Sequence, residues 1–169
     1  MKSLLPLVFI GPMAAGKSKI GRLVARRLSV PFIDTDKVIA AKHGPIPAIF
    51  AAQGEPAFRA YERDAVAEAM RGDAVVSLGG GAVLHPDTRL ELAGHTVVLL
   101  TVTRDAVAKR LAGSGRPLLD GDDAVERWAA IADTRMPIYE ALATETFDTS
   151  ARPITQIADD IVTWARERS

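Results

Sequence analysis

The sequence predicts an α/β fold in which a parallel sheet of about five strands is covered by helices on both faces. Short, continuously apolar runs alternate along the chain with segments in which apolar residues recur every three or four positions. The first apolar run, Leu4–Ile10, leads through a glycine-containing turn into an amphipathic segment with Ile20, Val24 and Leu28. Strands that are buried on both faces and separated by helices are typical of parallel sheets.

Composition favours a single soluble domain over residues 1–169. The chain has 169 residues, of which 48% are hydrophobic and 25% are charged. Lys plus Arg and Asp plus Glu number 21 each, so no basic field argues for nucleic acid or an anionic membrane. The chain has no cysteine, which excludes disulfides and thiolate chemistry. The N-terminal apolar run is broken by Pro6 and leads straight into the next turn, so we expect a cytoplasmic protein. The balanced charge favours small-molecule partners, and we expect a monomer.

The first turn carries a phosphate-binding motif. Residues 11–18 read GPMAAGKS and fit G-x-x-x-x-G-K-[ST] between a strand and a helix. Backbone N–H groups of such a loop hold a polyphosphate, while Lys17 reaches the β and γ phosphates and Ser18 ligates Mg²⁺. The alternative is a turn that binds nothing, but the strand and helix on either side favour a magnesium nucleotide. The expected ATP contacts here are Gly11, Ala14, Ala15, Gly16, Lys17, Ser18 and Lys19.

Two acids follow the second expected strand, Val30–Ile33. Asp34 and Asp36 stand at its carboxyl end, the edge where open α/β sheets bind ligands. In an extended segment both side chains would point the same way, toward the phosphate site. Capping of the next helix by Asp36 is the alternative, but it would explain one acid and not the pair.

A helical insertion, about residues 35–62, is expected between the second and third strands. The chain breaks at His43–Pro47, and short helices are expected over 48–53 and 55–70. Arg59 and Glu62 lie three residues apart on one of them, which by periodicity alone favours a solvated ion pair. The position of the insertion suits a cover over a second substrate.

Three glycines, Gly79, Gly80 and Gly81, follow the third expected strand at 74–78. They permit close approach of the backbone to a ligand, although a plain turn is the alternative. A helix near 86–93 and a fourth buried strand at 96–102 come next.

A glycine-punctuated loop, 113–121, follows a helix expected at 104–112. We expect a mobile lid over about residues 112–123, with Arg116 near its centre to stabilise charge on a transferred phosphoryl group. An ordinary solvent loop is the alternative.

The C-terminal third completes the fold. A helix over 125–142 should break or kink at Pro137, just after Arg135. A short last strand is expected at 146–149, and apolar residues at helical spacing from Ile154 to Ala165 predict a closing helix on the sheet. The three histidines are scattered and form no ligand cluster.

The motifs together resemble those of shikimate kinases. Their order, spacing and flanking residues agree over nearly the whole chain. The matching segments are GPMAAGKS at 11–18, DTD at 34–36, GEPAFRAYE at 54–62, SLGGGAV at 77–83 and RPLL at 116–119. The resemblance implies a nucleoside-monophosphate-kinase-like P-loop fold and transfer of phosphate from ATP to the 3-hydroxyl of shikimate, a step of aromatic amino-acid synthesis.

The same resemblance implies roles for individual residues. Lys17, Asp36 and Arg116 would be catalytic, with Asp36 orienting the reactive hydroxyl. Ser18 and, through water, Asp34 would hold Mg²⁺. The shikimate contacts would be Asp36, Arg59, Glu62, Gly79, Gly80, Gly81 and Arg135, with the two arginines on the carboxylate. Arg110, Arg152 and Pro153 would lie on the adenine side, and Arg116 would belong to the lid.

Three departures accompany the resemblance. Ala14 replaces a frequent glycine, Lys19 replaces a threonine, and the stretch from Asp36 to Arg59 is one residue short. Two other functions stay open at this point. A kinase for another small hydroxylated acid, such as gluconate, could use the same loop and acids. A nucleotide-sensing module that transfers nothing is less consistent with the acceptor-side residues.

Overall fold

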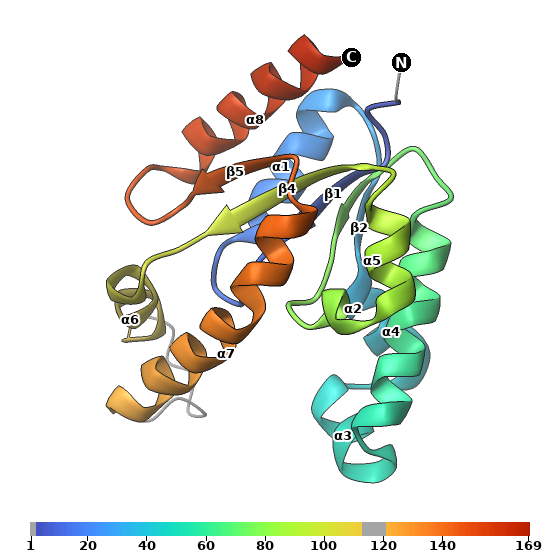
Figure 1. The fold of residues 1–169 in the computed structure, drawn as a ribbon, viewed down its shortest axis with the longest axis vertical. Helices are drawn as coiled ribbons and strands as arrows, with labels where there is room; N and C mark the ends of the chain where they lie inside the picture. Colours follow the sequence, from blue (N-terminus) through green and yellow to red (C-terminus); the bar gives the residue numbers. More distant parts are fainter. Residues whose placement is uncertain (1–2, 113–120) are drawn as a thin grey trace.

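The fold is taken from a computed structural model, which describes residues 3–112 and 121–169 (Figure 1). In chain order the elements are β1 Leu7–Ile10, α1 Lys17–Leu28, β2 Phe32–Asp34, α2 Thr35–His43, α3 Ile46–Gln53, α4 Glu55–Ala69, β3 Val75–Ser77, the 3₁₀ turn η1 Ala82–Leu84, α5 Pro86–Leu92, β4 Thr96–Thr101, α6 Arg104–Ala112, α7 Gly121–Leu142, β5 Glu145–Asp148 and α8 Ile154–Arg168.

The five strands form one parallel sheet in the order β2-β3-β1-β4-β5. β1 lies at its centre, with Leu7 in register with Val75 of β3 and Thr96 of β4. The parallel order places the carboxyl ends of all five strands at one edge. The loops after β1, β2 and β3, which carry the sequence motifs, therefore meet at that edge. The predicted fold class and strand number are confirmed.

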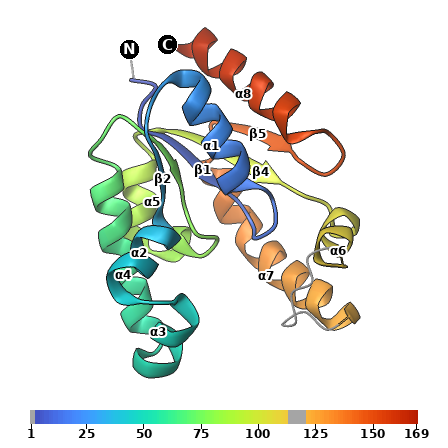
Figure 2. The same cartoon turned by 180° about the vertical axis from the view of Figure 1, so that it is seen from behind.

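Helices cover both faces of the sheet, as the apolar runs predict. Alternate residues of β1 face opposite ways: Leu7 and Phe9 pack with α1, α6 and α8, whereas Val8 and Ile10 pack with α4, α5 and α7. Helices α5 and α7 lie in front of the sheet in Figure 1, and α1 lies in front in the reverse view of Figure 2. Two apolar cores thus hold the strand ends in place.

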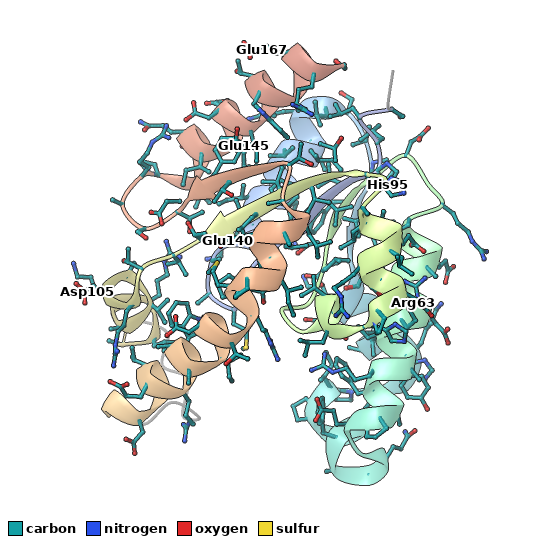
Figure 3. All side chains as sticks on the ribbon, viewed as in Figure 1. Arg63, His95, Asp105, Glu140, Glu145 and Glu167 are labelled. Atoms are coloured by element: carbon teal, nitrogen blue, oxygen red, sulfur yellow. The ribbon has the colours of Figure 1, made fainter. Side chains whose placement is uncertain are left out.

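The insertion between β2 and β3 consists of α2, α3 and α4 and runs through Ala69, somewhat beyond the predicted end at 62. A small core around Ile39, Ile49 and Phe58 holds the three helices together. Arg63 of α4 is labelled in Figure 3. Its guanidinium ties α4 to α5, because it donates to Thr88 Oγ1 at 3.0 Å and to Glu91 Oε2 at 2.8 Å.

Of the break or kink predicted at Pro137, the break does not occur. Helix α7 runs without interruption from Gly121 to Leu142. Pro137 is exposed, while Ala132 before it and Tyr139 after it are buried. An internal proline costs a helix about 3 kcal/mol, and Tyr139 packs this part of α7 into the core on the sheet.

The predicted lid falls mostly on residues 113–120, which lie outside the described residues, as does Arg116. In the part of the chain that the structure describes, no helix combines the length and the apolar character needed to span a bilayer.

Candidate active site

The phosphate loop is an irregular turn between β1 and α1. Gly11 has φ +142°, and an added Cβ would collide with the Leu100 carbonyl oxygen, so this position requires glycine. The Lys17 ammonium crosses the loop and donates to the Gly11 and Pro12 carbonyl oxygens at 2.7 and 2.8 Å. Ala14, at the position of a frequent family glycine, has φ +67°. This left-handed conformation costs a residue with a Cβ about 1–2 kcal/mol.

Ser18 and Asp34 meet at the start of α1. The Ser18 hydroxyl donates to Asp34 Oδ2 at 2.7 Å, and Asp34 Oδ1 accepts from the backbone N–H groups of Asp36 and Lys37 at 3.1 and 3.4 Å. Asp34, not Asp36, therefore caps α2, and the expectation of an extended Asp34–Asp36 segment is wrong because the helix begins at Thr35. Asp36 lies in the first turn of α2, and its carboxylate does not cap the helix.

The glycine triplet, Gly79–Gly81, packs directly against three charged side chains. An added Cβ would lie 2.7 Å from Asp36 Oδ1 at Gly79, 3.3 Å from Arg135 Nη1 at Gly80 and 2.5 Å from Arg59 Nη1 at Gly81. Side chains at the first and last of these positions would displace the charged groups. The triplet thus serves close packing, and it brings together groups from α2, α4 and α7.

Arg59 and Glu62 form a largely buried pair rather than the solvated one that periodicity favours. Arg59 Nη1 donates to Glu62 Oε1 at 2.8 Å, and the Glu62 side chain is only 4% exposed. Burial raises the pKa of Glu62, opposed by the hydrogen bond and charge of Arg59. A long contact of 3.4 Å joins Arg59 Nε to Glu55. Glu62 therefore fixes the Arg59 guanidinium beside the glycine triplet.

Tyr139 is a site residue that the sequence reasoning missed. It is fully buried, and its hydroxyl donates to the Gly80 carbonyl oxygen at 2.5 Å. Burial raises the pKa of Tyr139, opposed by the charge and hydrogen bond of Arg135 one helical turn earlier. The available signal was the i, i+4 spacing from Arg135 together with the partner that a buried tyrosine hydroxyl requires.

The pKa values of Lys17 and Asp36 are both shifted toward the neutral form, although the two groups lie near charges of opposite sign. Burial lowers the pKa of Lys17 to about 8, against the raising effect of the Asp36 and Asp34 carboxylates. Burial raises the pKa of Asp36, and the charge of Asp34 adds to the rise. Both groups thus carry their charge at a cost in the ligand-free protein. The negative charge of a bound phosphate would lower that cost for Lys17.

Arg110, Arg152 and Pro153 lie on the side of the phosphate loop away from the triplet, because they follow β4 and β5 whereas the triplet follows β3 on the other side of β1. Arg110 donates through Nη1 to the Ala14 carbonyl oxygen at 2.5 Å and through Nη2 to the Thr149 carbonyl oxygen. Arg152 pairs with Asp160 of α8 at 2.6 Å, and Pro153 is the N-cap of α8. Lys19 is exposed on α1.

Two further contacts on this side were not predicted. The Thr149 hydroxyl donates to the Ala15 carbonyl oxygen, and the Trp128 indole N–H donates to the Met13 carbonyl oxygen, both at 2.7 Å. Thr149 directly follows the last strand, at the edge of the sheet where ligands bind. This position in the sequence could have indicated a role at the site. Nothing in the local pattern around Trp128 indicates its contact.

A parallel sheet whose central strand opens into a G-x-x-x-x-G-K-S loop is the architecture of P-loop phosphotransferases. A sequence model of the shikimate kinase family matches residues 13–166. A shikimate kinase of Corynebacterium efficiens is 42% identical over 158 residues, covering 92% of this chain and 94% of that protein. The chain belongs to the shikimate kinase family.

Comparison with solved structures supports the same family. Shikimate kinase from Acinetobacter baumannii in complex with shikimate superposes with a TM-score of 0.89 at 30% identity, covering 99% of this chain and 96% of that one. A gluconokinase from Sinorhizobium meliloti reaches a TM-score of 0.64 at 19% identity, covering 96% and 91%, which shows a shared fold alone.

Proposed function

We propose that this protein transfers the γ-phosphoryl group of ATP to the 3-hydroxyl of shikimate, giving 3-phosphoshikimate and ADP. The observation that carries the proposal is the glycine triplet, against which Asp36, Arg59 and Arg135 converge beside the phosphate loop. A carboxylate and two guanidinium groups suit an acceptor that has a reactive hydroxyl and a carboxylate of its own. Membership of the shikimate kinase family supports the same acceptor.

On the acceptor side, Arg59 and Arg135 would grip the shikimate carboxylate, and Glu62 would hold Arg59 in place. Asp36 would accept a hydrogen bond from the 3-hydroxyl and orient it toward the γ phosphate. Its raised pKa makes it a better proton acceptor than an ordinary aspartate. A role for Arg116 as the lid arginine rests on the sequence motif.

On the nucleotide side, the backbone N–H groups of the phosphate loop would surround the β phosphate. Lys17 would exchange its carbonyl partners at Gly11 and Pro12 for phosphate oxygens. The Ser18 hydroxyl and the Asp34 carboxylate are hard oxygen donors that suit Mg²⁺, which would neutralise charge on the phosphates. Arg110 and the Arg152–Pro153 segment would border the adenine.

Release of ADP tests the proposal against its rivals. With MgATP, we expect rapid ADP release with shikimate, little with gluconate and little without an acceptor. Faster release with gluconate would assign the protein to another sugar-acid kinase. Binding of MgATP with no acceptor-dependent release would assign it to a nucleotide-sensing module.

Arg135→Ala is expected to lower kcat/KM for shikimate by roughly ten- to a hundredfold, because one guanidinium fork on the carboxylate is lost. MgATP affinity should stay within a few fold. A shikimate analogue without the carboxylate should be a poor substrate for the parent and should lose little more in the variant. If the two losses instead multiply, Arg135 does not bind that carboxylate.

Binding of MgATP at pH 8 is expected to take up about half a proton, because Lys17 is then about half protonated and the phosphates raise its pKa. The complex holds more proton than the free protein, so MgATP affinity should fall as the pH rises through 8. Calorimetry in buffers of different ionisation enthalpy measures the uptake. Lys17→Arg, which stays charged, should bind without uptake; equal uptake in both proteins would place the titrating group elsewhere.

A further inference from the structure

Three successive carbonyl groups of the phosphate loop are each held by a side chain from a different element. The donors are Trp128 Nε1 of α7 to Met13 at 2.7 Å, Arg110 Nη1 of α6 to Ala14 at 2.5 Å, and Thr149 Oγ1 after β5 to Ala15 at 2.7 Å. The three donors belong to α7, α6 and the segment after β5, whereas Lys17 of α1 donates to the Gly11 and Pro12 carbonyl oxygens.

These contacts orient the backbone N–H groups of the loop. In a trans peptide unit the C=O and the N–H point in opposite directions. A Met13 carbonyl held toward Trp128 therefore turns the Ala14 N–H the other way, toward the expected position of the phosphates. The Ala14 carbonyl, held by Arg110, orients the next unit similarly.

Trp128 holds the peptide unit before the Ala14 Cα, and Arg110 holds the peptide unit after it. Their orientations set φ and ψ of Ala14, whose φ of +67° is left-handed. A residue with a Cβ stays in this region only where its surroundings over-determine it. Glycine adopts the same conformation without such support.

We propose that Trp128 is a positioning residue for nucleotide binding. Its indole N–H holds the Met13 carbonyl outward and thereby keeps Ala14 in the left-handed conformation that the phosphate loop needs. Trp128 itself does not touch the nucleotide. The inference rests on the proposed function insofar as the loop binds MgATP, and it assigns to Trp128 a task that arises because residue 14 is alanine.

A double-mutant cycle between Trp128→Phe and Ala14→Gly tests this inference. Phenylalanine keeps the aromatic ring and removes the N–H. In the parent, Trp128→Phe should weaken MgATP binding about three- to tenfold by calorimetry, with KM for shikimate changed less than about twofold. In the Ala14→Gly background the same substitution should weaken MgATP binding by less than about twofold. The control is Trp164→Phe on α8, whose ring packs on Phe147; it should change neither value.

Equal weakening in both backgrounds would show that the effect of Trp128 does not depend on residue 14, and it would overturn the inference. So would no weakening in either background, or a parallel rise in KM for shikimate. A further measurement leaves Trp128 intact: Ala14→Gly alone should raise the melting temperature, because the strained Cβ is removed, and a lower melting temperature would contradict the assignment. Since calorimetry reads MgATP binding directly, a protein that binds MgATP but does not phosphorylate shikimate would disprove the proposed function and leave the cycle interpretable.

Discussion

Lys17→Ala is expected to lower kcat with ATP and shikimate by roughly a thousandfold. Phosphoryl transfer is catalysed mainly by positioning and by stabilisation of charge, and removal of one preorganised donor from such a site costs about 10²–10³ in rate. The loss should be at the upper end because the Lys17 ammonium is poorly hydrated, as its pKa of about 8 indicates. Steady-state assays of ADP release at saturating substrates give the comparison.

Lys42→Ala is the matched control, because it removes the same charge from an exposed ion pair with Glu68 on the insertion. It should keep kcat within about twofold of the parent. A Lys17→Ala enzyme within about tenfold of the parent would contradict the assignment of the phosphate loop.

Asp36→Asn is expected to lower kcat by about 10²–10⁴, because the amide keeps the shape but cannot serve as an anionic acceptor for the hydroxyl. MgATP affinity should stay within a few fold by calorimetry. The exposed acid Asp64 on α4 offers a control, and Asp64→Asn should leave both quantities near the parent values. Lost MgATP affinity in Asp36→Asn would place Asp36 on the nucleotide side.

The same variant should be at least as stable as the parent near neutral pH. Because the folded-state pKa of Asp36 is raised, its ionisation lowers the free energy of unfolding, and that loss is complete once the pH exceeds the raised value. Asparagine does not ionise. A melting temperature clearly below that of the parent would show that the carboxylate stabilises the fold, and the kinetic loss would then need another explanation.

The strands and the phosphate loop could be predicted from the sequence because both depend on local patterns. A continuous apolar run such as Val97–Leu100 is buried on both faces whichever neighbours it has. The G-x-x-x-x-G-K-S spacing, with an apolar run before it and helical periodicity after it, likewise predicts a strand-to-helix turn. The continuation of α7 through Pro137 depends on tertiary packing of Tyr139, which no local pattern records.

The acceptor side was predictable only in part. Asp36 was identified from its position after the second strand, whereas the acceptor roles of Arg59 and Arg135 came from the family resemblance. The packing of all three on the glycine triplet depends on how three separate helices reach one sheet edge. The sequence pattern did not identify Asp34 as the cap of α2. The cap it offered as the alternative was Asp36, whereas the helix begins at Thr35, two residues before Lys37. Tyr139, Thr149 and Trp128 act on backbone carbonyl groups, whose positions only the folded chain defines.

The most direct test of the proposed reaction is the identity of its product. Parent enzyme with MgATP and shikimate should give ADP and a phosphorylated acid in equal amounts, and phosphorus–proton coupling in NMR spectra should join the new phosphate to the proton on C3. That result would agree with a 3-hydroxyl oriented by Asp36 toward the nucleotide. A phosphate on another hydroxyl, or free inorganic phosphate with unchanged shikimate, would contradict it.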